Sequence, residues 1–114
     1  MKTFKFKHCG CAHVGLFRLG KYGNGRLAVR LYEKTELGLE PYATLSVNPG
    51  DDEVVGAGEF VMKIYSENAG LFDDLYARGL VVQAAHPPRY VTIGITDCPV
   101  LRLTDKAREH SEEL

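Results

Sequence analysis

The chain has 114 residues, which is enough for one domain with an ordinary hydrophobic core. Apolar residues make up 45% of it and charged residues 25%, a balance that excludes collagen-like and disordered proteins. The net charge of −1 is unevenly distributed, because residues 1–34 carry +7 and residues 35–114 carry −8. No apolar run approaches the roughly 18 residues of a membrane-spanning helix, so we expect no contact with a membrane.

Strict alternation predicts that the chain opens with a half-buried strand. Residues 2–7 place Phe4 and Phe6 on one face and two lysines on the other. Gly10 then predicts a bend, after which residues 14–19 continue as a second strand. We therefore expect the phenylalanines in the core and the lysines at the surface.

A glycine-rich connection and a third strand follow. The Asn-Gly pair within residues 20–25 predicts a β-hairpin, because both central positions of a type I′ turn need a positive φ. Residues 26–33 put three aliphatic side chains on one face and Arg30 and Tyr32 on the other. The outer face of this strand should be basic and aromatic.

The middle of the chain is expected to form two more strands. Residues 42–47 are rich in strand-favouring residue types, with Ala43, Leu45 and Val47 facing inward. An acidic, glycine-containing loop separates them from a fifth strand over residues 59–65.

One helix of about three turns is expected next. Apolar residues recur at helical spacing from Leu71 to Tyr76, and Gly79 ends the pattern. We interpret Ser66 and Asn68 as caps that satisfy the free N–H groups at the start of this helix.

Two or three further strands complete the predicted fold. Residues 80–84 and 90–95 flank His86-Pro87-Pro88, a rigid turn whose prolines cannot donate hydrogen bonds. Residues 100–103 supply a last strand.

The order of elements predicts an α+β fold. It consists of a mainly antiparallel sheet, a meander of about five strands, with one short helix packed on it and two or three strands after the helix. Residues 104–114 hold too few apolar side chains to pack. We therefore expect a single α+β domain over residues 1–103 and a flexible acidic tail after it.

The densest group of chemically active side chains follows the first strand. On an extended strand Cys9, Cys11 and His13 share a face while His8 points away, so those three are the candidate metal ligands if Gly10 bends the chain. No second pair of ligands at zinc-site spacing follows, and we expect free thiols and no cofactor. The number of cysteines is odd and the N-terminal residues lack the apolar segment of a secretory leader. Both observations favour a location in the reducing cytoplasm.

Sequence motifs of catalytic sites are missing from the chain. Its serines lack a nucleophile elbow, and no P-loop, G-x-G-x-x-G or H-E-x-x-H pattern occurs. This favours a non-enzymatic protein, with a metal- or thiol-dependent enzyme as the third choice.

Two surface patches are candidates for binding a partner. The first is a basic sheet face whose charges suit phosphates or an acidic protein, although any half-exposed strand also carries lysine and arginine. Its members are Lys5, Lys7, Arg18, Lys21, Arg26, Arg30 and Tyr32. The second lies at the junction of strand and helix and on the exposed back of the helix. Its members are Tyr65, Glu67, Asn68, Asp73 and Asp74.

Two stretches of the chain resemble a known protein family. They are Tyr-Ala-Thr-Leu-Ser-Val-Asn at residues 42–48 and Gly-Glu-Phe-Val-Met-Lys-Ile-Tyr-Ser-Glu-Asn-Ala-Gly-Leu at residues 58–71. Both are similar to an uncharacterised family of small bacterial proteins often carried by phages and other mobile elements. The similarity extends from about Arg26 to Leu103 and implies a genetic setting, since no activity is assigned to the family.

Small proteins in that setting frequently block host defence systems. We therefore predict a non-enzymatic cytoplasmic protein, a monomer or homodimer, that binds and inhibits a host defence complex made of protein or ribonucleoprotein. An anti-CRISPR protein is one example of such an inhibitor. The alternative prediction is a nucleic-acid-binding module that uses the basic sheet face.

Overall fold

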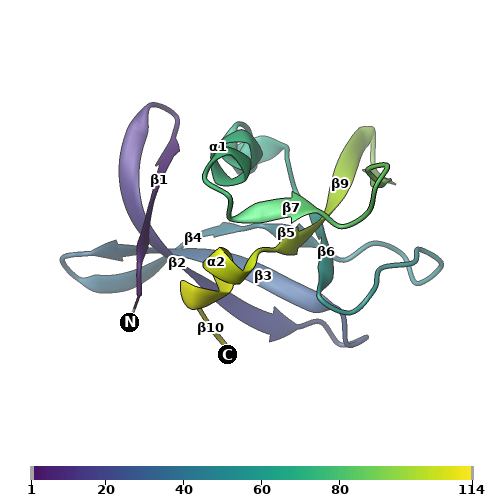
Figure 1. Cartoon of the computed structure of the whole chain (residues 1–114), viewed down its shortest axis with the longest axis horizontal. Helices are drawn as coiled ribbons and strands as arrows, with labels where there is room; N and C mark the ends of the chain where they lie inside the picture. Colours follow the sequence, from purple (N-terminus) through teal and green to yellow (C-terminus); the bar gives the residue numbers. More distant parts are fainter. Residues whose placement is uncertain (1, 114) are drawn as a thin grey trace.

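The computed structural model describes residues 2–113, which form two mainly antiparallel sheets and short helices (Figure 1). The predicted α+β class with a mainly antiparallel sheet is confirmed. The strands are β1 (Phe4–His8), β2 (Cys11–Lys21), β3 (Leu27–Thr35), β4 (Gly38–Thr44), β5 (Ser46–Val47), β6 (Glu59–Met62), β7 (Val81–Gln83), β8 (Tyr90–Ile93), β9 (Thr96–Leu103) and β10 (Ser111–Glu113). The helices are the 3₁₀ helix η1 (Ser66–Asn68), α1 (Leu71–Ala77) and α2 (Asp105–Glu109).

The first sheet is the predicted meander, in the order β1-β2-β3-β4. Phe4 and Phe6 are buried and the lysines beside them are exposed, as the alternation of β1 predicts. Figure 1 shows that β1 and the first part of β2 rise out of the plane of β3 and β4 and stand next to α1. The first sheet is therefore strongly bent.

The meander ends after four strands, so the prediction of a fifth strand in the same sheet is wrong. The chain leaves the first sheet at Leu45, which is fully buried, and β5 pairs with β6 in a second sheet of order β5-β6-β9-β7. The two sheets are joined at this point, since the Val29 N–H donates to the Ser46 hydroxyl over 2.9 Å. β8 also pairs with β9, in the first half of that strand.

The predicted hairpin over residues 20–25 is confirmed, but with another type of turn. The Gly25 N–H donates to the Tyr22 carbonyl, and among residues 20–25 the positive φ belongs to Gly25, at 84°. This is a type I turn closed by a left-handed glycine. A turn with two positive φ angles lies instead between β1 and β2, at Cys9 (53°) and Gly10 (79°).

The predicted three-turn helix is divided. η1 and α1 are separated by Gly70, whose φ of 83° is left-handed and interrupts the helical backbone. The prediction that Ser66 and Asn68 cap the helix is wrong, because neither helix has a side-chain hydrogen bond at its N-terminal cap. The Asn68 amide nitrogen instead donates to the carbonyls of Thr44 and Lys63, and the side chain is fully buried.

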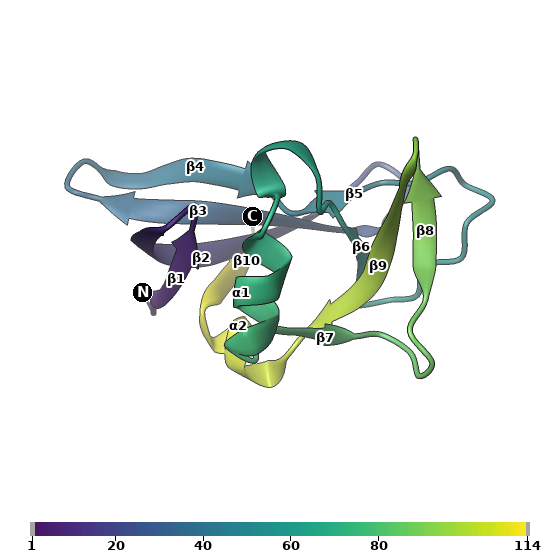
Figure 2. The same cartoon turned by 90° about the horizontal axis from the view of Figure 1, so that it is seen from above.

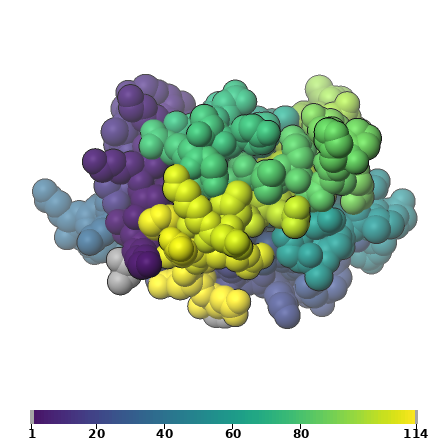
Figure 3. All heavy atoms as spheres, viewed as in Figure 1, coloured from purple at the N-terminus to yellow at the C-terminus, as the bar shows by residue number. Residues whose placement is uncertain are grey.

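Residues 105–113 are folded, which corrects the prediction of a flexible tail. The Thr104 hydroxyl accepts a hydrogen bond from the Ala107 N–H and so caps α2, which buries Ala107 completely. β10 then runs parallel to β2, with Glu112 opposite Arg18. Figure 3 shows these C-terminal residues, in yellow, packed between the purple N-terminal strand and the green segments.

The core lies between the two sheets and under the helices. It combines Phe6 and Phe17 of the first sheet, Leu101 of the second, Leu75 of α1 and Ala107 of α2. Within residues 2–113, the helices are all too short to cross a membrane.

Candidate partner-binding site

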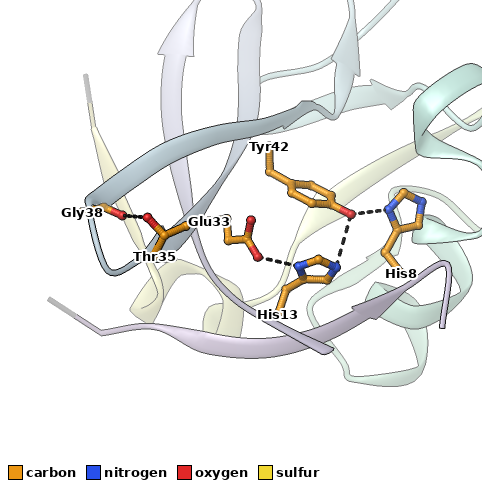
Figure 4. A network of polar contacts seen from close by, with 6 residues as sticks. All are labelled: His8, His13, Glu33, Thr35, Gly38 and Tyr42. Carbon is orange, nitrogen blue, oxygen red and sulfur yellow. Dashed lines mark hydrogen bonds and ion pairs between the residues drawn. The ribbon is translucent and has the colours of Figure 1, made fainter. Parts of the chain in front are cut away.

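Four polar side chains of the first sheet form one connected cluster (Figure 4). His13 Nδ1 lies 2.5 Å from a Glu33 carboxylate oxygen, and His13 Nε2 lies 3.5 Å from the Tyr42 hydroxyl. The same hydroxyl lies 2.6 Å from His8 Nδ1, and His8 Nε2 lies 3.0 Å from the Ala69 carbonyl. The cluster therefore connects both hairpins of the first sheet to the segment before α1.

The hydrogen-bond partners fix the roles of these side chains. A carbonyl only accepts, so His8 Nε2 donates to Ala69, and His8 Nδ1 is left to accept the Tyr42 proton. Tyr42 faces the histidines because the register of β3 and β4 shifts between Leu31 and Tyr32, and such a bulge turns a side chain towards a new direction. His8 is also 92% buried, since its exposed fraction is 8%.

Burial raises the pKa of Tyr42 above its ordinary value of 10.0, and the nearby Cys9, Glu33 and Cys11 add to the shift. Tyr42 is thus a stable hydrogen-bond donor at neutral pH and a poor nucleophile. A phenol held between two imidazoles can relay a proton, but each of its neighbours already has a partner inside the protein. We interpret the cluster as a structural connection between the hairpins.

The candidate metal ligands are arranged differently from the prediction. Opposite residues of an antiparallel pair share a face, and the register pairs His8 with Cys11 and Phe6 with His13. His8, Cys11 and His13 therefore lie on one face, because the turn at Cys9 and Gly10 reverses the chain. In the part of the chain that the structure describes, no three His, Cys, Asp or Glu side chains are placed to hold a metal ion.

The structure divides the predicted basic face into separate parts. Arg18 and Arg30 are opposite each other in β2 and β3, and the Arg18 guanidinium lies 4.5 Å from the centre of the Tyr32 ring. Lys5 and Lys7 belong to the part of the sheet that bends up beside α1. The central group is therefore Arg18, Arg30 and Tyr32.

Some of the predicted basic residues already have partners. Arg18 Nε donates to a Glu112 carboxylate oxygen at 2.6 Å, and this bond raises the pKa of the guanidinium. The Arg26 guanidinium donates to the carbonyls of Pro49, Gly50 and Glu53 and so holds the acidic loop. Lys21 and Arg26 line a different open hollow, of about 450 Å³, formed with residues 55–58.

Arg30 lies in a surface hollow that contains members of both predicted patches. We call this the Arg30 hollow, and its volume is about 240 Å³. It is lined by Arg30, Leu31, Tyr32, Pro41, Tyr42, Ala43, Thr44 and Glu67. Arg30 and Tyr32 belong to the first predicted patch and Glu67 to the second, so β3, β4 and the start of η1 meet here.

The remaining members of the second patch do not form one exposed surface. Asn68 is fully buried, so it is not free to contact a partner, and Tyr65 is half-buried against a second apolar cluster. Asp74 accepts hydrogen bonds from the Lys7 N–H and from Arg78, whereas Asp73 is exposed. Glu67 pairs with Lys63 at 2.7 Å, which lowers its pKa.

Sequence reasoning missed Glu33, Tyr42 and Glu112 as members of these groups. The residue types alone carry no signal for them, since their roles depend on a bulge in β4 and on the pairing of β10 with β2. No family model, curated protein or solved structure matches this chain. The resemblance to mobile-element proteins therefore stays a prediction.

Proposed function

We propose that the protein is a non-enzymatic accessory protein that acts in the cytoplasm by binding and inhibiting a host defence complex. The Arg30 hollow is the proposed docking site. The single observation that carries the proposal is that Arg30 lines this hollow together with Tyr32 and Tyr42 and has no ion-pair partner among residues 2–113. The mobile-element resemblance supplies the kind of partner.

The composition of the hollow supports a macromolecular partner. Arginine and tyrosine are the residue types that most often dominate binding energy at protein interfaces. At about 240 Å³ the hollow is smaller than typical small-molecule pockets, which begin at roughly 300 Å³. A single side chain of a partner fits it better than a substrate does.

The charge around the hollow favours an acidic protein segment over a nucleic acid. Nucleic-acid binding is carried by several phosphate contacts, whereas Arg18 is neutralised by Glu112 and Arg26 is bound to backbone carbonyls. An inhibitor of a ribonucleoprotein complex would then contact its protein part.

The test uses cells in which a CRISPR system restricts an invading plasmid. Expression of the wild-type protein should restore plasmid entry and co-purify a component of the defence complex, and Arg30→Glu should remove both effects. Arg108→Glu, the same charge change at an exposed position on α2, is the matched control and should behave as wild type.

Two results would contradict the proposal. One is full inhibition by Arg30→Glu, and the other is an absence of any defence component or inhibition with the wild-type protein. A gel shift of DNA or RNA that weakens steeply with salt and is lost in Arg30→Glu would replace it with the nucleic-acid alternative.

A further inference from the structure

The second sheet ends in β7, and no strand among residues 2–113 pairs with the outer edge of β7. Leu80 and Ala84 exchange backbone hydrogen bonds with residues around β9, since the Thr104 N–H donates to Leu80 and the Ala84 N–H donates to Val100. Residues of an antiparallel strand face its partner alternately, so the N–H and C=O groups of Val81 and Gln83 point away from β9. Within residues 2–113, no hydrogen bond to these four groups is formed.

Other edges of the molecule are protected in ways that β7 is not. On β1, the Lys7 N–H donates to the Asp74 carboxylate over 2.9 Å. On β4, Pro41 has no N–H, and the register shift beside it distorts the edge. β7 consists of Val-Val-Gln and has neither charge nor proline. Figure 2 shows β7 at the border of the molecule, next to α1.

A groove of about 510 Å³ lies beside this edge. Its apolar side chains include Tyr76 and Val82, which are 49% and 38% exposed, and the connection between β7 and β8 adds Pro88. Its charged side chain is Arg102, which is exposed and is opposite Val82 in the pairing of β7 with β9. An apolar groove with a cation suits a segment that combines an apolar and an acidic side chain.

A buried polar atom at the groove also lacks a partner. The side-chain oxygen of Gln83 is inaccessible to solvent and accepts no hydrogen bond from the described residues. Gln83 is also one of the residues that line the groove.

We propose that β7 binds an extended, acidic peptide segment of a partner protein as an additional strand. The segment pairs with the outward N–H and C=O groups of Val81 and Gln83. Its apolar side chain lies in the groove beside Tyr76, and its acidic side chain reaches Arg102. This surface is on the second sheet and is independent of the Arg30 hollow, so it does not rest on the proposed function.

The probe is a synthetic peptide of about seven residues in which every second position is threonine and the positions between them are valine and glutamate in turn, so that both of these side chains lie on one face of the strand. It is titrated into the full ¹⁵N-labelled chain and followed by NMR. We expect the largest shifts at the amides of Val81, Gln83 and their neighbours, including Tyr76. A peptide with lysine in place of glutamate should bind at least about tenfold more weakly, since Arg102 then repels it.

Two controls separate strand pairing from simple charge attraction. The same peptide with N-methyl groups on alternate residues cannot pair along one edge, and the form methylated on the pairing edge should bind about tenfold more weakly. In the protein, Arg102→Glu should weaken binding about as much, whereas Arg30→Glu should not.

Several outcomes would overturn the proposal. They are equal binding of the lysine and glutamate peptides, equal binding of both methylated forms, shifts centred elsewhere, or no binding of the valine-glutamate peptide. A concentration-dependent dimer with shifts at Val81 and Gln83 in the absence of peptide would assign the edge to a second copy of the chain. Loss of peptide binding with retained inhibition of defence would refute this inference alone.

Discussion

Two groups of polar side chains on the first sheet differ in how many partners they have inside the protein. The first group, which we call the interior cluster, consists of His8, His13, Glu33 and Tyr42. In it, both ring nitrogens of His8 are hydrogen-bonded and His13 is paired with Glu33. In the Arg30 hollow a few residues away, the guanidinium has no ion-pair partner among residues 2–113. The difference teaches that a histidine-rich motif can be structural while a single arginine is the group left free to bind.

The three cysteines also differ from one another, since two are exposed and one is buried. The largest effect that we expect is the difference in their rates of reaction with a thiol reagent. Cys9 and Cys11 are exposed at the turn between β1 and β2, whereas Cys98 is fully buried and burial raises the pKa of its thiol. Cys98 should therefore react with a thiol reagent about 100-fold more slowly or worse, because reaction requires opening of the fold. Mass spectrometry of timed samples measures this, and equal rates in the folded protein would contradict it.

Asn68 is expected to contribute most to stability among the predicted partner residues. Asn68→Ala removes the donor to the Thr44 and Lys63 carbonyls and leaves a small cavity. We expect a loss of about 2–3 kcal/mol in the free energy of unfolding. Urea denaturation measures it, with the exposed neighbour variant Glu67→Ala as the control that should leave the midpoint nearly unchanged.

Removing the Tyr42 hydroxyl tests the interior cluster. Tyr42→Phe keeps the ring contacts with Phe6 but leaves His8 Nδ1 buried without a donor. The free energy of unfolding should fall by about 1–2 kcal/mol. A variant as stable as wild type would show that the cluster does not hold the hairpins together.

Tyr42 also makes the free energy of unfolding depend on pH in the alkaline range. We expect this effect to be smaller than the loss of stability in Tyr42→Phe. The pKa of Tyr42 is raised in the folded protein, so its stabilising contribution is complete below the unfolded value of 10.0. That contribution is lost as the pH rises through the folded pKa. Between pH 9 and pH 11, wild type should therefore lose more stability than Tyr42→Phe, and parallel losses would contradict the assignment.

Arg30 should show the smallest effect on stability. Arg30→Ala removes no ion pair described in the structure, so the free energy of unfolding should change by less than about 0.5 kcal/mol. Binding of the partner should nevertheless be lost. A large loss of stability in Arg30→Ala would show that Arg30 has a structural role and is not simply a side chain left free for docking.

Local sequence patterns predicted the parts of the fold that local chemistry determines. Alternation placed Phe4 and Phe6 in the core, and the Asn-Gly pair located the hairpin between β2 and β3. The α+β class followed from the order of such segments. These features depend on neighbouring residues, which is why they are readable from one sequence.

Other parts depend on contacts between distant residues. Leu45 looks like the middle of a strand, but the chain changes sheets there. Residues 105–113 are mostly polar, which predicts that they do not pack. In the structure α2 packs against the core through one small side chain, Ala107. The Arg30 hollow likewise depends on Glu67 lying beside β3, 37 residues away along the chain.

The parallel pairing of β10 with β2 has a consequence for the order of folding. Arg18 and Glu112 are 94 positions apart, and their strands are neighbours in the first sheet. Contacts of such long range slow folding, because a long loop must close before they form. During synthesis, β1 to β4 can pair early, but the first sheet is completed only after residues 111–113 have left the ribosome.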